Sequence, residues 1–282
     1  MSRQLQPLGQ KQPATRITVK RRRLWSPRSH LAWIKGLIVC LFFLAGAATI
    51  FWLVDPNWFN EKQATARIRH GNQMPISRLV RQPRHAVKGV KYGDTSKGAM
   101  GDISPAQLAH DAKAGYPLYK RGEIVVPRQE GVSVGIHVSI FEGTSVTALA
   151  YGAGTAKPNE LMGQGNYALS AHNMADNVTY FSPLQNKLHP NARPYVYITD
   201  KRRIYEYQIY NQSHDPKGKV IVPLTDVGVL NDTSTPQLTM TTCYEIPPNY
   251  ANAQDRVIVR GNLVTSKSWQ QAPQKWRDLF NP

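Results

Sequence analysis

The stretch Ile204–Tyr210 reads IYEYQIY and places Tyr205, Tyr207 and Ile209 on one face of an extended chain, because successive side chains of a strand point to opposite sides. Similar short stretches, rich in Val, Ile, Tyr and Thr and separated by Gly, Pro and Asn, recur from residue 122 onward. They are Gly122–Pro127, Val138–Gly143, Ala148–Gly154, Asn166–His172, Tyr195–Asp200, Ile204–Gln212, Gln237–Cys243 and Arg256–Val264. Short strands at this spacing, with no long helical period between them, predict an all-β domain, either a closed barrel or a sandwich.

The positive charge of the chain is concentrated before these strands. The formal net charge is +17 over 282 residues. Residues 1–35 hold nine Lys or Arg and no acidic residue, whereas sixteen basic and thirteen acidic residues follow from Pro117 onward. A nucleic-acid-binding domain concentrates basic and stacking aromatic side chains on its folded part. The near-neutral strand region therefore argues against nucleic acid as a partner.

An uncharged segment directly follows the basic N-terminus. Gly36–Val54 is nineteen residues long, about the length that crosses a bilayer core of ~30 Å as a helix. Basic residues precede it while Asp55 and Glu61 follow, so the positive-inside rule predicts a cytoplasmic N-terminus and an extracellular remainder. A cleaved signal peptide is the alternative, because Ala45-Gly46-Ala47 has the small residues of a cleavage site. Since the apolar run continues to Val54, we favour an uncleaved single-pass anchor.

The chain between this anchor and the strands lacks a sustained apolar period. We expect residues 55–101 to form a polar stalk, flexible or only partly ordered. A short helix is expected at Ser104–Ala112, where Ser104 can cap the first turn and Pro105 suits its first position. The predicted organisation is a basic cytoplasmic tail (1–35), the transmembrane anchor (36–54), the stalk (55–101), a folded domain (102–268) and a C-terminal tail (269–282).

The two cysteines lie in different parts of this organisation. Cys40 falls inside the predicted membrane span and cannot pair with Cys243 in the outer domain. Cys243 ends a predicted strand, and an irregular stretch containing Pro247-Pro248 follows before Arg256 opens the next strand. An unpaired thiol in an exported domain either packs as a small hydrophobic side chain or carries chemistry.

A second group of residues surrounds His172. A Gly-rich approach, Gly163-Gln164-Gly165, leads into a predicted strand that ends at His172, much as another strand ends at Cys243. The domain has three other histidines, and a lone histidine is more often a packed or surface residue than a catalyst. They are His137, His189 and His214. The strand-end position favours His172 over these three.

Arg256 and Arg260 compete for the place nearest the thiol. They are four residues apart and so share a face of their strand, separated by ~13 Å at ~3.3 Å per residue. If the strands on either side of the loop form an antiparallel hairpin, Cys243 and Arg256 are the pair nearest the loop. We therefore predict that Arg256, and not Arg260, reaches the thiol.

Taken in order, these segments resemble the sortases. The resemblance is carried by Leu-Thr-x-x-Thr-Cys ending at Cys243, by the Arg thirteen residues later, and by the preceding Gly-Asn-Tyr-x-Leu-x-x-His strand. Three further segments are similar to the class A branch: Gly122–Pro127, Gly152–Thr155 and Pro223–Val227. The resemblance covers about Gly122–Val264. It implies an eight-stranded sortase-type β-barrel with short helices, preceded by one transmembrane helix.

The resemblance also implies an activity and roles for four residues. The activity is transpeptidation, with Cys243 as the nucleophile and His172 as the acid that protonates the leaving amine and the base that activates the incoming one. Arg256 is expected to hold the substrate backbone or the developing oxyanion. Thr242 is expected to help shape the oxyanion and substrate pocket.

The partners implied are surface proteins with a Leu-Pro-x-Thr-Gly-like sorting signal, and an amine of peptidoglycan or of a lipid-linked precursor, met at the membrane. Some class A members bind calcium. In this chain the loop Lys157–Asn166 offers only Glu160 as a carboxylate, and a later loop offers Asp232, which is too few for six to eight oxygen ligands. We expect neither a metal nor a cofactor.

Two alternatives use the same sequence features. An exported cysteine hydrolase would employ Cys243, His172 and Arg256 but release the acyl group to water. A non-enzymatic, membrane-anchored wall-binding β-domain would keep Cys243 as a buried structural thiol. Reaction of Cys243 with an active-site thiol probe separates the second alternative from an enzyme.

Overall fold

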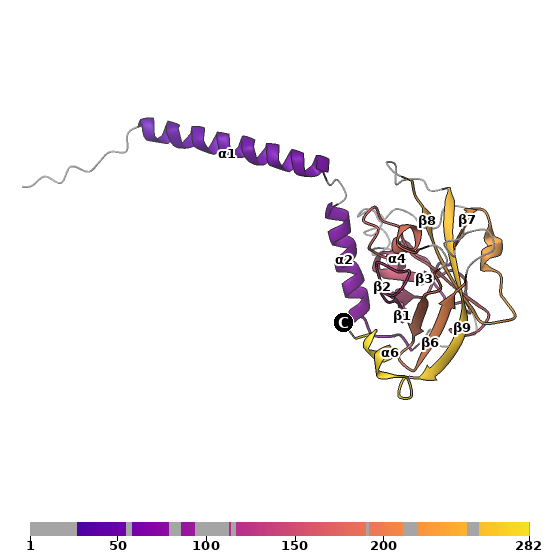
Figure 1. Cartoon of the computed structure of the whole chain (residues 1–282). Helices are drawn as coiled ribbons and strands as arrows, with labels where there is room; N and C mark the ends of the chain where they lie inside the picture. The colour runs from indigo at the N-terminus through magenta and orange to yellow at the C-terminus, as the bar shows by residue number, and fades with distance from the viewer. Residues whose placement is uncertain are drawn as a thin grey trace, which may run out of the picture. The chain divides into compact units, whose positions relative to one another are not determined.

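The computed structural model describes residues 27–54, 58–78, 86–93, 113, 117–189, 192–210, 219–246 and 254–281. The chain divides into two compact units, Met1–Pro56 and Asn57–Pro282. Figure 1 shows the helices and strands of both units.

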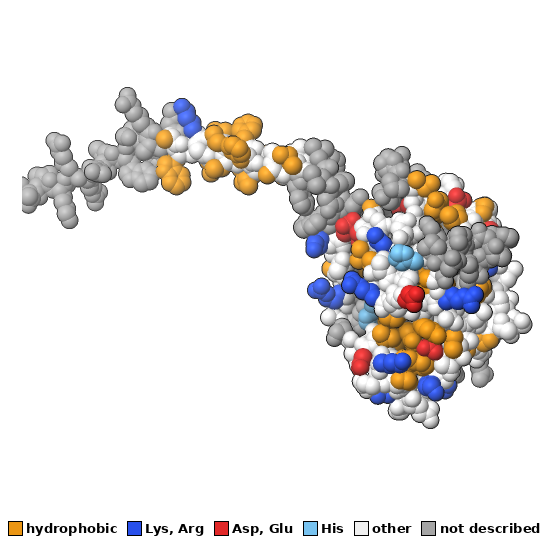
Figure 2. All heavy atoms as spheres, viewed as in Figure 1, with side chains coloured by type: hydrophobic (Ala, Val, Ile, Leu, Met, Phe, Trp, Pro, Cys, Tyr) orange, Lys and Arg blue, Asp and Glu red, His pale blue; other side chains and the backbone are white. Residues whose placement is uncertain are grey.

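The first unit contains one long helix, α1, which spans Pro27–Val54. Its stretch Ala32–Ile50 is long and apolar enough to cross a membrane, and none of that stretch is buried within the chain. Hydrophobic side chains cover much of the visible face of α1 (Figure 2), and Leu37, Phe42 and Phe43 are all exposed. A helix that is apolar all round, without a polar face, suits a bilayer. The single membrane span expected from the sequence thus has a matching helix.

The second unit is built around a closed β-barrel whose strands wrap around a common interior (Figure 1). In chain order these strands are β1 (Lys120–Val126), β2 (Ile136–Phe141), β3 (Gly152–Thr155), β4 (Asn166–Ser170), β5 (Tyr195–Thr199), β6 (Arg203–Ile209), β7 (Lys219–Pro223), β8 (Gln237–Tyr244) and β9 (Asp255–Ser268). The sheet order is β6-β5-β1-β2-β3-β4-β8-β9-β7, and a further pairing between β6 and β9 closes eight strands into a ring. The predicted eight-stranded barrel is confirmed. The ninth strand, β7, pairs with β9 alone.

The alternation in β6 supplies side chains to both faces of the barrel wall. Tyr207 and Ile209 are fully buried in the main core cluster, against which Tyr205 also packs. Ile204 points the other way, into a second cluster with Val125 and Trp276. Fully burying an aliphatic or aromatic side chain stabilises a fold by about 1.5–3 kcal/mol, so one strand contributes to two apolar layers.

The segment expected to be a stalk, residues 55–101, contains a helix. Helix α2 spans Trp58–Gln73 and packs on α4 (Val146–Tyr151) and β2. Ala64 of α2 is buried in the main core, and a Cβ added at Gly71 would lie 2.5 Å from the backbone oxygen of Tyr151. A helix that approaches the barrel this closely belongs to the folded domain. The stalk prediction is therefore corrected for this helix, and the folded domain begins well before residue 102.

Residues 269–282 were expected to be a tail, and this expectation is corrected as well. They carry helix α6 (Gln274–Asp278), and Trp276 and Phe280 are only 6% and 2% exposed, within the second apolar cluster. The Lys201 ammonium donates to the Phe280 carbonyl at 3.0 Å. These contacts attach the C-terminal segment to the outer face of the barrel.

Two strand predictions differ from the structure. The predicted strand Ala148–Gly154 starts as the last turn of α4, and only Gly152–Thr155 is extended as β3. Strand β7 was not predicted. The connections also carry the short helices α5 (Pro183–Asn186) and η2 (Val227–Leu230). The helix predicted at Ser104–Ala112 lies outside the described residues.

Candidate active site

Cys243 is the penultimate residue of β8. This strand has β4 parallel to it on one edge and β9 antiparallel to it on the other. The β9 ladder runs past Cys243 to Tyr244, whereas the β4 pairing ends at Thr241, so hydrogen bonds to β9 fix the direction of the Cys243 side chain. Cys243 is 9% exposed. The thiol is thus held firmly near the end of a barrel strand.

Arg256 lies directly opposite Cys243. The two residues are Cα partners in the antiparallel β8–β9 pairing, and Arg260 is the partner of Thr239, four residues earlier in β8. Residues facing each other in such a pair have Cα atoms ~4.5–5.5 Å apart. The predicted hairpin, with Cys243 and Arg256 side by side near its loop, is confirmed. Arg256 is 9% exposed, and its Nη1 donates to the Asp255 carbonyl at 3.0 Å.

His172 reaches the same place through β4. The parallel pairing places Ser170 of β4 beside Thr241 of β8, and the Ala171 N–H continues it by donating to the Thr241 carbonyl at 3.1 Å. The next residue is His172, two positions after the end of β4. It is 7% exposed, and its ring meets that of Tyr180 edge-on, with centroids 5.6 Å apart.

Burial changes the protonation of His172. Loss of solvent, together with the positive charge of Arg67 on α2, lowers the pKa of His172 to about 4. The imidazole is therefore neutral at pH 7 and able to accept a proton. Its Nε2 is buried and has no hydrogen-bond partner among the described residues. Buried polar atoms nearly always have a partner, so this imidazole nitrogen is an exception among the described residues.

The lowered pKa of His172 predicts how stability depends on pH. Above the unfolded-state pKa of ~6.5, His172 is neutral in both the folded and the unfolded protein. As the pH falls toward 4 only the unfolded chain gains the proton, so the free energy of unfolding decreases, by up to ~3 kcal/mol from this group. We expect His172→Gln to lose less Tm than wild type between pH 7 and 4.5 in thermal melts. Parallel curves for the two proteins would contradict the assigned pKa.

The remaining sequence candidates lie elsewhere. The Thr242 side chain is fully buried and its hydroxyl donates to the Ala171 carbonyl at 2.8 Å. Its neighbour Thr241 lines the nearby cavity, and the expected part of Thr242 in shaping the oxyanion and substrate pocket stays a prediction. His137 contacts Glu123, with 3.1 Å between Nε2 and Oε2, and His214 lies outside the described residues.

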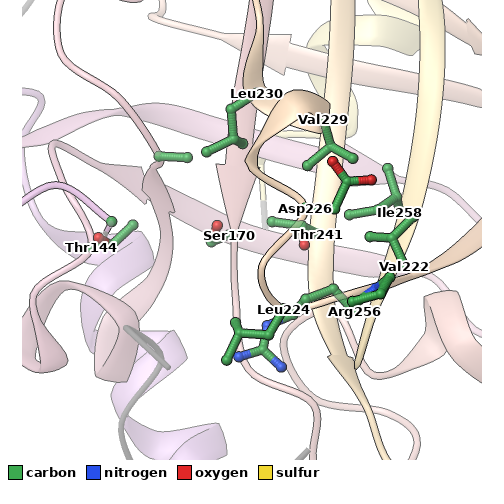
Figure 3. A pocket seen from close by; sticks show the side chains of 13 residues that line it. Thr144, Ser170, Val222, Leu224, Asp226, Val229, Leu230, Thr241, Arg256 and Ile258 are labelled. Carbon is green, nitrogen blue, oxygen red and sulfur yellow. The ribbon is translucent and has the colours of Figure 1, made fainter. Parts of the chain in front are cut away.

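An apolar cavity lies beside Arg256, between β7, η2 and the ends of β4, β8 and β9 (Figure 3). The Arg256 side chain extends along it, and most of the wall is aliphatic. The lining side chains include Val222, Leu224, Val229, Leu230 and Ile258, with the hydroxyls of Thr144, Ser170 and Thr241. Sequence reasoning missed this wall because the segment from Val222 to Leu230, which includes the end of β7 and η2, supplies about half of its lining residues. The β-branched run Val220-Ile221-Val222 was the available signal.

The carboxylates of the two candidate calcium loops do not fit a divalent cation. The Lys157 ammonium lies 3.7 Å from Glu160 Oε1 and also contacts Asp232, so a cation of the protein already sits between them. Burial raises the pKa of Glu160 to about 8, which leaves it largely protonated at neutral pH. Within the described residues no group of three or more His, Cys, Asp or Glu could hold a metal ion.

We therefore predict that catalysis is independent of calcium. The rate of peptide cleavage should be the same within error in excess chelator and in millimolar calcium, because Lys157 occupies the position between the two loop carboxylates. As a control, the variant Lys157→Met removes that ammonium, and its rate of peptide cleavage is measured under the same two conditions. A several-fold increase of the wild-type rate with calcium would contradict the prediction.

Several known proteins are similar to this chain. Residues 126–264 match the Sortase domain family. Sortase A from Streptococcus agalactiae serotype III (strain NEM316) is 30% identical over 257 residues, which cover 88% of this chain and 92% of the relative. Sortase A from Bacillus anthracis is 25% identical over 83% of this chain and 97% of the relative. Among solved structures, Listeria monocytogenes sortase A matches 58% of this chain and 97% of its own, with 25% identity and a TM-score of 0.47.

The barrel places Cys243 near the end of β8 with Arg256 opposite it on β9, and His172 two residues after β4. The similarity to sortases indicates that the chain is a cysteine transpeptidase. It belongs to the sortase family, as its match to a 30% identical relative over 88% of its length shows. The relatives named Sortase A agree with the class A branch. Its general activity is therefore that of a cell-wall transpeptidase, which joins surface proteins to cell-wall amines.

Proposed function

We propose that this sortase cleaves a Leu-Pro-x-Thr-Gly-like signal between Thr and Gly through a thioester on Cys243. It then transfers the acyl group to an amine of peptidoglycan or of a lipid-linked precursor. The observation that carries this proposal is the cross-strand pairing of Cys243 with Arg256, with His172 following the adjacent parallel strand β4. Nucleophile, proton carrier and fixed cation thus come from three neighbouring strands.

The neutral state of His172 supports a definite proton path. His172 accepts the thiol proton as the Cys243 sulfur attacks the Thr carbonyl carbon. The Thr–Gly C–N bond breaks, His172 gives the proton to the leaving amine, and an S–C thioester remains. An incoming amine then gives a proton to His172, its nitrogen forms the new amide bond, and the S–C bond breaks. The proton returns to the Cys243 thiolate. A positioned acid–base group typically contributes 10²–10⁴-fold to the rate.

Arg256 supplies the electrostatic part of the mechanism. Its guanidinium stays protonated at any physiological pH, and Arg256 both pairs with Cys243 across the strands and lines the apolar cavity. In the transition state negative charge grows on the Thr carbonyl oxygen, and Arg256 donates hydrogen bonds to that oxygen. A preorganised donor of this kind is often worth ~3 kcal/mol of transition-state stabilisation.

The cavity beside Arg256 supports an apolar start to the signal. We propose that the Leu and Pro side chains of the signal lie against Val222, Leu224 and Leu230, upstream of the scissile bond. An aliphatic wall favours burial of such side chains, and the only charged residues that line the described cavity are Asp226 and Arg256. The hydroxyls of Ser170 and Thr241 are then available to the peptide backbone.

The charge around α1 supports the orientation of the enzyme. We propose that the N-terminus is cytoplasmic and that the barrel works outside the cell, because residues 1–35 carry nine bases and no acid and positive segments stay inside. The surface-protein substrate and the amine acceptor then meet the thiol on the outer side of the membrane.

The test is a trapped acyl-enzyme. Full-length protein in detergent micelles is mixed with a Leu-Pro-x-Thr-Gly peptide, quenched in acid and digested, and the mass of the Cys243 peptide is measured. We expect the acyl mass on Cys243 alone, and its replacement by a new amide product when a glycine-based amine is added. An adduct that goes only to hydrolysis product, whatever the amine concentration, would favour the cysteine hydrolase. No adduct at all would overturn the thioester mechanism.

A further inference from the structure

The chain on both sides of His172 is bonded to the strand that carries Cys243. Before His172, the Ala171 carbonyl accepts from the Thr242 hydroxyl at 2.8 Å. After His172, the Asn173 side-chain amide donates to the Cys243 carbonyl at 2.8 Å. The histidine is thus held from both sides against β8.

The Asn173 bond takes the place of a ladder bond. In parallel pairing every second residue of a strand donates its backbone N–H to the neighbouring strand. Ala171 does so to Thr241, and Asn173 is the next residue in that series, with the Cys243 carbonyl as the next acceptor. Its side chain makes that bond instead. The backbone can therefore leave the sheet after His172 while the two strand ends remain connected.

Gln185 of α5 extends this connection beyond Cys243. Its Oε1 accepts from Asn173 Nδ2 at 2.6 Å and from the Glu245 N–H at 3.1 Å. Its Nε2 donates to the Glu245 carbonyl at 2.6 Å. A buried side chain, 7% exposed, thus pairs with Glu245 as a neighbouring strand would. We call Asn173 and Gln185 the amide clamp.

We propose that the amide clamp positions Cys243 and His172 relative to each other for the reaction, which makes Asn173 and Gln185 positioning residues. The inference rests on the proposed function. A clamp that only stabilised the fold could be lost with a lower Tm and an unchanged turnover number. A clamp that positions the reacting groups must affect kcat, because a misplacement of about 1 Å can cost ~10²-fold in rate. The peptide-binding wall lies elsewhere, so KM should change little.

The experiment compares Asn173→Leu and Gln185→Leu, which keep the size of each side chain but remove its hydrogen bonds, with wild type. Asn186→Ala is the matched control, since Asn186 neighbours Gln185 in α5 and its exposed side chain donates to Asn177 Oδ1 at 2.6 Å. For each full-length protein in micelles, kcat, KM and Tm are measured below the unfolding range. Deuterium uptake at residues 243–246 is followed by mass spectrometry.

For both clamp variants we expect kcat to fall by about 10–100-fold with KM within about threefold, and faster exchange at residues 243–246 while β4 and the rest of β8 stay protected. Asn186→Ala should match wild type. Faster exchange with kcat unchanged would overturn the positioning role, and so would unchanged exchange. A fall in kcat together with loss of protection throughout the barrel would also overturn it, because general unfolding would then explain the loss of activity. Wild-type protein that neither cleaves nor transfers peptide would instead overturn the proposed function, while exchange still reports whether the clamp holds.

Discussion

Cys243→Ala is expected to abolish both peptide cleavage and amine transfer, with a Tm within a few degrees of wild type. The sulfur is the only group proposed to bond to the substrate, and without it the loss should reach the background rate. The change removes the sulfur from a residue that is 9% exposed, and in a domain of this size a cost near 1 kcal/mol lowers Tm by only about 2–4 °C. Activity is measured by product formation with and without amine, and Tm by circular dichroism.

Cys40→Ala is the matched control for this variant. Cys40 is an exposed thiol on α1, so its loss should leave cleavage, transfer and Tm unchanged. Retained turnover in Cys243→Ala would show that another group attacks the peptide. A variant that no longer folds would instead identify Cys243 as a structural thiol, the role it has in a non-enzymatic wall-binding domain.

The barrel could be predicted because its strands follow a two-residue period. In β6 the buried Tyr207 and Ile209 face the main core as the alternation requires. Ring closure could not be read from the same pattern, which is common to barrels and sandwiches. Closure depends on the long strand β9, which pairs with β8 and β7 along its first half and with β6 along its second.

The helices were harder to predict than the strands. Helix α2 turns Ala64, Ile68 and Gly71 toward the barrel, and these positions have helical spacing but contain little apolar surface. In α4 the signal was present: Ser145 accepts from the Ala148 N–H at 3.1 Å as an N-cap, and alanine favours helix. Helix α6 is too short for a periodic pattern, although Trp276 and Phe280 stand one turn apart.

The site was predicted in part. Cys243 and Arg256 lie on consecutive segments of one hairpin, so counting residues from the loop predicts their pairing. His172 reaches β8 through a parallel pairing of distant segments, and no local pattern predicts which strands become neighbours in that way. The same holds for the bond between Asn173 and Cys243, seventy residues apart in sequence.

Arg256→Lys is expected to lower kcat for cleavage and transfer by about 100-fold, whereas Arg260→Lys should stay within a few-fold of wild type. Lysine keeps the charge but is a single flexible ammonium, which cannot reproduce the planar two-donor edge of a guanidinium. A lost oxyanion donor costs about 10²–10³ in kcat. Because Arg256 is the cross-strand partner of Cys243, the loss should appear in kcat and not in Tm.

Arg260 is the matched control because it has the same charge on the same strand and face. Its cross-strand partner is Thr239, ~13 Å along β8 from the thiol at ~3.3 Å per residue. Its carbonyl accepts from the Tyr210 N–H at 3.2 Å, so its backbone contact is to the segment after β6. Steady-state kinetics of both variants, with Tm as the fold control, decide between the two arginines. A crippled Arg260→Lys beside an active Arg256→Lys would mean that the reacting carbonyl lies farther down the barrel, and that the thiol reaches it by a rearrangement of β8.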